Sequence, residues 1–251
     1  MSSPFDLTGR SAVVTGGGRG LGHGITRALL RAGADVVVLG RSELPSDLVT
    51  QAGALGRGLH FFPVDLADGD AISATAAKVL AAQRVDILVN NAGTQERHAA
   101  VDFPLPAWDR VMDTNLRAVF QLCQLFGRPM LERGAGKVVN LASLLSFQGG
   151  LTVPAYAASK GAVAQLTKAL CNEWASQGVN VNAVAPGYMD TEMNAALMAD
   201  PVRMQQLSVR IPAARWGRPE DIGNVVVFLA SEASAYVHGQ VLAVDGGWLA
   251  R

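Results

Sequence analysis

The chain has 251 residues, and its 21 basic side chains balance its 21 acidic ones. This neutral composition, without any run of basic residues, argues against nucleic acid or an anionic membrane as the main partner. Hydrophobic residues make up 49% of the chain, but no apolar run approaches the ~18 residues that suggest a membrane span. The first ten residues lack the basic and apolar parts of a signal peptide.

The cysteines and histidines indicate neither a disulfide framework nor a metal site. Cys123 and Cys171 both fall in segments with a helical pattern, and the four histidines are scattered. Reduced, buried thiols are typical of proteins in a reducing compartment. We therefore expect a cytoplasmic protein without a metal, and its length fits one domain spanning residues 1–251.

Apolar runs alternate with helical patterns along the whole chain. The predicted strands cover residues 11–15, 35–39, 59–64, 85–89, 138–142, 179–184 and 241–244. The predicted helices cover residues 20–32, 45–55, 70–82, 106–131, 155–176 and 219–231, and a mobile substrate loop with helical character is expected at about 188–212. Strict alternation of this kind predicts an α/β protein: a single-domain, three-layer, doubly wound Rossmann fold with a seven-stranded parallel sheet.

A glycine-rich segment lies between the first strand and the first helix. It reads Gly16-Gly17-Gly18-Arg19-Gly20-Leu21-Gly22. Glycines at such a junction let the backbone approach a pyrophosphate, whose charge is then placed at the helix N-terminus. Because the segment lies inside a strand–helix–strand unit of about 30 residues, it favours dinucleotide binding over a purely structural turn.

Tyr156 and Lys160 form the second candidate site. Four residues apart on a helix, the phenol and the ammonium lie on one face. A nearby cation lowers the pKa of a tyrosine, which suits the phenol to proton transfer. Ser143 follows a predicted strand, at the edge of the sheet where α/β proteins bind ligands. The spacing alone is also compatible with an ordinary solvated pair.

Together these motifs resemble those of the short-chain dehydrogenase/reductase family over essentially the whole chain. The matching segments are TGGGRGLG (15–22), Asp65-Leu66, NNAG (90–93), Asn115, Ser143 with YAASK (156–160), and Pro186-Gly187 with Thr191. The resemblance implies that the cofactor is bound by Gly16, Arg19, Gly20, Leu21, Gly22, Arg41, Asp65, Leu66, Asn91, Ala92, Gly93, Tyr156, Lys160, Pro186, Gly187, Met189 and Thr191.

The resemblance also implies a reaction: hydride exchange at a carbinol or carbonyl carbon. Ser143 would hydrogen-bond the substrate oxygen, and Tyr156 would take or donate its proton. Lys160 would lower the pKa of Tyr156 and hold the nicotinamide ribose, while Asn115 would hold a water that connects Lys160 to solvent. The nicotinamide supplies the hydride chemistry, and the protein supplies orientation and charge.

The choice of nicotinamide depends on the end of the second strand. An acidic residue there would bind the ribose 2′-hydroxyl of NAD(H) and repel a 2′-phosphate. The sequence has Leu39-Gly40-Arg41-Ser42 instead. Arg41 and Arg19 could bind the 2′-phosphate, because a guanidinium pairs well with phosphate. We therefore favour NADP(H) over NAD(H), for which Arg41 would be a solvated residue that stacks on adenine.

The substrate is indicated by a finer resemblance. The segments SLLSFQGG (143–150), IPAARWG (211–217) and VDGGWLAR (244–251) resemble the 2-deoxy-gluconate and 2-dehydro-3-deoxy-gluconate dehydrogenase branch. A sugar acid needs a cation for its carboxylate and polar groups for its hydroxyls. The candidate contacts are Gln95, Arg97, His98, Gln148 and Arg215, each of which could equally be a surface side chain. Glu96 is an awkward neighbour for a carboxylate unless it faces outward.

Two alternatives remain open. A 3-oxoacyl-thioester or broad ketone reductase would need an apolar tunnel, which Leu144, Leu145 and Phe147 could line. A non-catalytic nucleotide-sensing Rossmann module would usually lack the tyrosine or the lysine, both of which this chain keeps. From the family we also expect a homotetramer, in which Trp248 and the residues after it could cover a neighbouring subunit's site.

Overall fold

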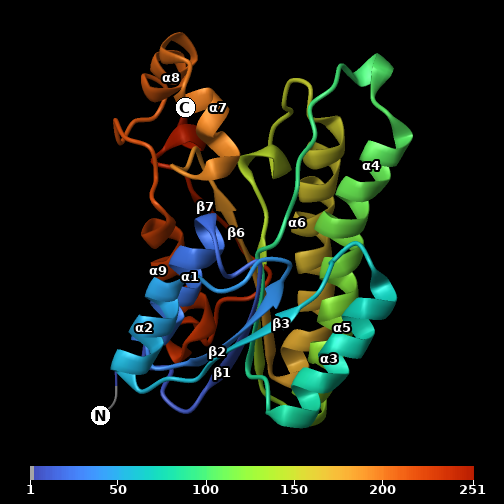
Figure 1. Cartoon of the computed structure of the whole chain (residues 1–251), viewed down its shortest axis with the longest axis vertical. Helices are drawn as coiled ribbons and strands as arrows, with labels where there is room; N and C mark the ends of the chain where they lie inside the picture. Colours follow the sequence, from blue (N-terminus) through green and yellow to red (C-terminus); the bar gives the residue numbers. More distant parts are fainter. Residues whose placement is uncertain (1–2) are drawn as a thin grey trace.

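A parallel sheet of seven strands forms the centre of the molecule (Figure 1). The computed structural model describes residues 3–251; residues 1 and 2 of the predicted domain lie outside the described residues. The strands are β1 (Ser11–Thr15), β2 (Asp35–Gly40), β3 (Leu59–Pro63), β4 (Ile87–Asn90), β5 (Gly136–Leu141), β6 (Val179–Pro186) and β7 (Val241–Val244). Their order is β3-β2-β1-β4-β5-β6-β7, with parallel pairing throughout. The predicted fold class is confirmed.

Helices cover both faces of this sheet, which gives three layers (Figure 1). One face carries α1 (Gly20–Arg31), α2 (Ser46–Leu55) and α9 (Pro219–Ala230). The other carries α3 (Gly69–Ala82), α4 (Leu105–Met112), α5 (Ala118–Glu132) and α6 (Pro154–Trp174). Within residues 3–251, no helix has both the length and the apolar character required to cross a membrane.

Two apolar cores separate the layers, because successive strand residues point to opposite faces. On β1, Val13 faces the core that contains Leu122 and Phe126 of α5. Val14, the next residue, faces the core that contains Leu29 of α1 and Val226 of α9. Both cores are buried, which explains why the strands read as continuous apolar runs and not as alternating ones.

The chain changes direction between β1 and β4. After β3, at one edge, it crosses back and adds β4 on the other side of β1. The connections that leave the carboxyl ends of β1 and β4 therefore go to opposite faces of the sheet. α/β proteins bind ligands in the crevice that opens at such a point, and here the crevice lies beside Gly16 and Asn91.

The helix predicted at 106–131 is interrupted in the structure. A π-helical turn at Asp113–Arg117 separates α4 from α5, and Asn115 lies within it. Helical periodicity cannot reveal one inserted residue, so the sequence did not predict this turn. Such π-helical turns occur frequently at functional sites.

The predicted substrate loop is composed of short helices. It contains a 3-10 turn at Glu192–Asn194, α7 (Ala195–Met198) and α8 (Pro201–Ser208). The C-terminus ends beside α7 and α8 (Figure 1). Further 3-10 turns lie at Ala100–Asp102, Leu144–Ser146, Ala175–Gln177, Glu232–Ser234 and Trp248–Ala250.

The contact between α1 and α9 provides a test of the packing. A Cβ atom on Gly223 would lie 2.6 Å from the carbonyl oxygen of Gly24 and 2.9 Å from Ala28 Cβ. We expect Gly223→Ala to lower the free energy of unfolding by about 1–3 kcal/mol through overpacking. Urea denaturation would measure it.

Gly53 offers the matched control. It lies within α2, and nothing comes within 4 Å of an added Cβ. Gly53→Ala should raise the free energy of unfolding by about 0.5–1 kcal/mol, because alanine favours a helix more than glycine does. Equal effects of the two substitutions would contradict the close contact between α1 and α9.

Candidate active site

The glycine-rich turn forms a cradle at the N-terminus of α1. Gly16 and Gly20 have φ values of +64° and +52°, which an L side chain rarely adopts. A Cβ atom on Gly22 would lie 2.0 Å from the Gly16 carbonyl oxygen, so no side chain fits there. Arg19, the residue before α1, has an exposed side chain. This backbone geometry fits a pyrophosphate, whose charge would meet free N–H groups and the positive end of the helix.

The segment after β4 is fastened to this cradle. Asn91 Nδ2 donates to the carbonyl oxygens of Thr15 (2.8 Å) and Gly16 (3.3 Å). The Ala92 amide donates to Thr15 Oγ1 at 2.9 Å. The structure thus brings together Gly16, Asn91 and Ala92, which the sequence predicts as cofactor contacts.

Other predicted cofactor residues surround the same edge. Gly40 lies beside the glycine-rich turn, because a Cβ atom added to Gly40 would lie 3.7 Å from Gly16 Cα. Arg41 is the next residue and is exposed. Asp65 is exposed, and its carboxylate accepts a hydrogen bond from the Ala67 amide. The Leu66 side chain packs in the core, so only its backbone could face a cofactor.

The nicotinamide end of the predicted site follows β6. The Gly187 amide, directly after Pro186, donates to the Val244 carbonyl oxygen at 2.9 Å. Thr191 approaches the cradle, since its Cβ lies 3.9 Å from the position of a Cβ on Gly20. Met189 is buried and pairs with Gly217 through an isolated β-bridge. Thr191 and the glycine-rich turn, far apart in sequence, therefore meet in space.

Asn115 is the buried centre of the site. Its Oδ1 accepts from the Thr94 amide, and its Nδ2 donates to the Thr94 carbonyl oxygen, both at 2.8 Å. Nδ2 also donates to Ser159 Oγ at 3.2 Å. Gly93 completes the cluster, because a Cβ there would lie 3.4 Å from Asn115 Oδ1 and 3.7 Å from Lys160 Nζ. The side chain of Asn115 thus joins the β4 loop to α6, and the predicted water is not tested by these contacts.

Lys160 is almost completely buried beside Tyr156. Its Nζ lies 5.7 Å from the centre of the Tyr156 ring and donates to the Leu141 carbonyl oxygen. Burial lowers the pKa of Lys160 to about 8. Burial likewise raises the pKa of Tyr156, while a hydrogen bond with Ser143 opposes that rise.

The pKa of Tyr156 shifts in the direction opposite to the one expected from the sequence. The sequence predicts that Lys160 lowers the pKa of Tyr156, whereas the loss of solvation dominates in the structure and moves that pKa upward. The hydrogen bond with Ser143 acts in the opposite direction and favours the phenolate.

Ser143 follows β5 and begins a tight turn. Its Oγ accepts from the Leu145 amide at 3.2 Å, and its amide donates to Ser146 Oγ at 3.3 Å. Ser146 Oγ in turn donates to the Lys160 carbonyl oxygen at 2.7 Å. Ser146 therefore ties the Ser143 turn to α6, a role that no sequence motif indicated.

The predicted substrate residues have different surroundings. Gln95 is half-buried and Arg97 is exposed, both on the loop after β4. Glu96, the awkward neighbour, is paired with Arg110 at 2.9 Å and lies 3.6 Å from His98. Arg110 therefore neutralises Glu96.

Two more predicted substrate residues, Arg215 and Gln148, make hydrogen bonds to other side chains of the protein. Arg215 is held by both oxygens of Asp221, at 2.7 and 3.0 Å, so it is not free to bind a substrate carboxylate. Gln148 accepts a hydrogen bond from Trp248 Nε1 at 3.3 Å. Trp248 is only 3% exposed within its own chain, whereas Ala250 and Arg251 are exposed. A contact of these last residues with a neighbouring subunit's site stays a prediction.

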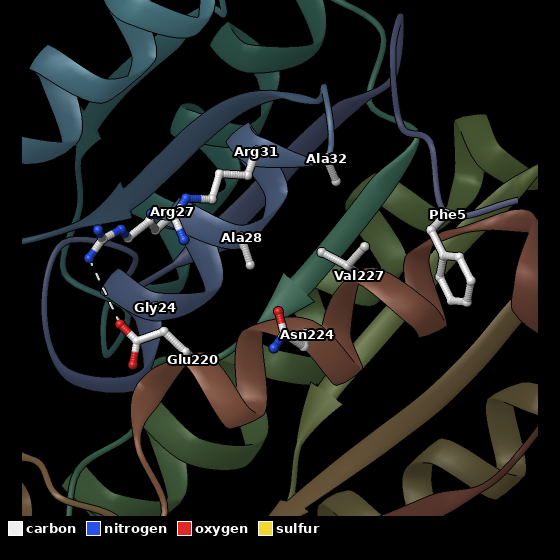
Figure 2. Close-up of a pocket in the computed structure, with 9 residues that line it drawn as sticks. All are labelled: Phe5, Gly24, Arg27, Ala28, Arg31, Ala32, Glu220, Asn224 and Val227. Atoms are coloured by element: carbon white, nitrogen blue, oxygen red, sulfur yellow. Dashed lines mark ion pairs between the residues drawn. The ribbon is translucent and has the colours of Figure 1, made fainter. Parts of the chain in front are cut away.

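A surface pocket of about 460 Å³ lies between α1 and α9, away from these residues (Figure 2). Its lining includes Phe5, Arg27 and Glu220, and Arg27 and Glu220 are 3.8 Å apart. None of the predicted site residues lines it. Across residues 3–251, no group of three or more potential metal ligands is found.

The carboxyl edge of the sheet combines a phosphate cradle with a buried lysine, a tyrosine and a serine, which defines the class of dinucleotide-dependent oxidoreductases. A family model described as enoyl-(acyl carrier protein) reductase matches residues 16–249. The 2-dehydro-3-deoxy-D-gluconate 5-dehydrogenase of Bacillus subtilis is 50% identical over 247 residues, which cover 98% of this chain and 97% of the relative.

Solved structures agree over the whole chain. A candidate 2-deoxy-D-gluconate 3-dehydrogenase from Agrobacterium tumefaciens, with bound NADP, has a TM-score of 0.94 at 49% identity and covers all of both chains. A gluconate 5-dehydrogenase from Burkholderia cenocepacia, in complex with NADP and tartrate, has a TM-score of 0.91 at 39% identity, covering 99% of this chain and 98% of the other. The chain belongs to the short-chain dehydrogenase/reductase family and is an NAD(P)-dependent oxidoreductase.

The burial of Lys160 predicts a pH-dependent stability. With a folded-state pKa of about 8 and an ordinary value of 10.5, the unfolded chain binds more protons between these limits. The stability of wild type relative to Lys160→Met should therefore increase as pH rises from 8 towards 10.5, by up to about 3 kcal/mol. Urea denaturation at several pH values would measure this difference.

Lys168 is the control, because it is an exposed lysine on the same helix. The difference between wild type and Lys168→Met should stay constant over that range. A constant difference for Lys160→Met as well would mean that the ammonium is solvated.

Proposed function

We propose that this protein is an NADP(H)-dependent dehydrogenase that oxidises a secondary alcohol of a sugar acid, such as a deoxy-gluconate, or reduces the corresponding ketone. The observation that carries this proposal is the full-length similarity to gluconate-type dehydrogenases. The cradle beside the buried Lys160 and the half-buried Tyr156 supports it. NAD(H) is the alternative cofactor. Support for NADP(H) comes from the two relatives with bound NADP and from Arg41 at the end of β2.

The proposed mechanism uses the groups of the carboxyl edge. The Ser143 hydroxyl donates to the substrate oxygen and stabilises the negative charge that develops there. In oxidation, the Tyr156 phenolate accepts the alcohol proton; in reduction, the phenol donates it. The bound nicotinamide accepts or supplies the hydride. Lys160 supplies a positive charge near the phenol, and its low pKa of about 8 lets it exchange protons near neutral pH.

Asn115 acts in this proposal as a positioning residue. Its amide fixes the backbone at Thr94 and contacts Ser159, the neighbour of Lys160. It would therefore keep the loop that carries Gln95 and Arg97 at a constant distance from α6. The mobile segment at about 188–212 would close over a bound substrate from the other side.

The acyl-thioester alternative has less support from the packing. Of the three residues that could line an apolar tunnel, Leu144 is buried in a cluster with Trp216 and Trp248. Phe147 is exposed and lines a surface pocket with Lys168 and Val241. These side chains therefore do not form a common channel.

We further propose a homotetramer in the cytoplasm. Several large apolar side chains are exposed in the single chain and could be covered by other copies: Val101, Leu105, Phe120 and Leu151. Both Cys123 and Cys171 are free thiols, as expected in a reducing compartment.

The mechanism is tested by removing the phenolic oxygen. Tyr156→Phe keeps the ring and should lower kcat by about 100- to 10,000-fold, the usual contribution of a general acid or base. NADPH binding, followed by its fluorescence, should change little. Tyr188→Phe is the control, because Tyr188 packs against Trp248 near the same site. Near-normal turnover in Tyr156→Phe would remove Tyr156 from the proton transfer.

A further inference from the structure

The proposed sugar-acid activity leaves the cation for the substrate carboxylate unassigned. Arg215 is committed to Asp221 through two hydrogen bonds. A different arginine, Arg210, has the properties that Arg215 lacks. It follows α8, within the predicted substrate loop, and its side chain is exposed.

Trp248 holds the Arg210 side chain in place. The guanidinium carbon lies 3.9 Å from the centre of the Trp248 ring. Among residues 3–251, no carboxylate oxygen lies within 4.0 Å of Arg210, and its guanidinium makes no hydrogen bond to another of these residues. A stacked guanidinium keeps its N–H groups available in its own plane, where they match the two oxygens of a carboxylate.

The backbone of Arg210 is also fixed. Its amide donates to the Leu207 carbonyl oxygen at 3.1 Å. Its own carbonyl oxygen accepts from Arg251 Nε at 3.3 Å, and Arg251 also donates to the Val209 carbonyl oxygen at 2.6 Å. The last residues of the chain thus hold the segment that presents Arg210.

Trp248 connects Arg210 to the catalytic side of the molecule. Its Nε1 donates to Gln148, five positions after Ser143, and its ring lies 4.7 Å from that of Tyr188. Leu144, adjacent to Ser143, is buried in the same apolar cluster as Trp248. Arg210 therefore packs on Trp248, which belongs to an apolar cluster that also contains Leu144, the residue after Ser143.

We propose that Arg210 is a specificity-determining residue that binds the substrate carboxylate, and that Trp248 is its positioning residue. This inference rests on the proposed sugar-acid function. The carboxylate end of the substrate would be held by the Arg210 guanidinium, so that the chain of hydroxyls extends toward Ser143 and Tyr156. An uncharged polyol of the same length would gain nothing from Arg210.

Binding and turnover separate this inference from the proposed function. D-gluconate and its uncharged counterpart D-glucitol are titrated into the enzyme with NADP⁺, and their dissociation constants are compared by calorimetry. Wild type should bind gluconate more tightly than glucitol. Arg210→Gln should weaken gluconate binding ~10- to 100-fold, as expected for a hydrogen-bonded charge pair, and leave glucitol binding unchanged. Arg203→Gln is the matched control, because Arg203 is an exposed arginine of α8 that contacts Gln206, and this variant should keep the preference.

The Trp248 variants test positioning. Trp248→Phe keeps an aromatic face for Arg210 and should retain most of the preference for gluconate, whereas Trp248→Leu should lose it. NADPH binding reports whether each variant is folded. In steady-state kinetics the loss should appear in KM for the acid and not in kcat.

Two outcomes would overturn the inference: no preference of wild type for gluconate over glucitol, or an unchanged preference in Arg210→Gln. An Arg97→Gln variant that loses the preference would instead assign the carboxylate to Arg97. An enzyme that binds gluconate through Arg210 but turns over no sugar acid would contradict the proposed function alone.

Discussion

The site depends on one buried amide. Asn115 carries no charge and reaches no solvent, yet its side chain satisfies both backbone groups of Thr94 and contacts Ser159. A buried amide without partners would cost several kcal/mol, so the three segments that it joins must stay in register for the protein to fold. Asn115 lies within the π-helical turn and is completely buried. Without the Asn115 side chain, no hydrogen bond from this position would connect Thr94, in the loop after β4, to Ser159 in α6. These two segments form opposite sides of the site.

The electrostatics follow from the same burial. Lys160 is held at the carbonyl of Leu141, where a charge is poorly solvated, and its pKa falls to about 8. Tyr156 is subject to the same loss of solvation with the opposite sign, so its pKa rises. The two shifts have opposite signs and move the pKa values apart, so in the folded protein the Lys160 ammonium loses its proton more easily than the Tyr156 phenol. Burial opposes ionisation of Tyr156, and the hydrogen bond with Ser143 favours it. A bound substrate oxygen would meet both hydroxyl groups.

Much of this was predictable from the sequence, and the misses have physical reasons. Strands and main helices follow from periodicity, and the glycine-rich turn from the need for a close backbone approach. The π-helical turn was missed because one inserted residue does not disturb a helical pattern. The commitment of Arg215 to Asp221, the stacking of Arg210 on Trp248 and the link from Ser146 to Lys160 join residues whose contacts depend on tertiary packing. Composition and local spacing carry no signal for such contacts, which is why the catalytic residues were easier to nominate than the walls around them.

We propose that the carboxyl edge of the sheet transfers a hydride between a sugar acid and NADP. The most direct test uses D-gluconate deuterated at its carbon-bound positions, incubated in ordinary water with NADP⁺ or NAD⁺. We expect deuterium to appear on the reduced nicotinamide ring, detected by NMR, and to accumulate faster with NADP⁺. Reduced cofactor without the label would contradict direct hydride transfer, and faster labelling of NAD⁺ would contradict the assignment of Arg41.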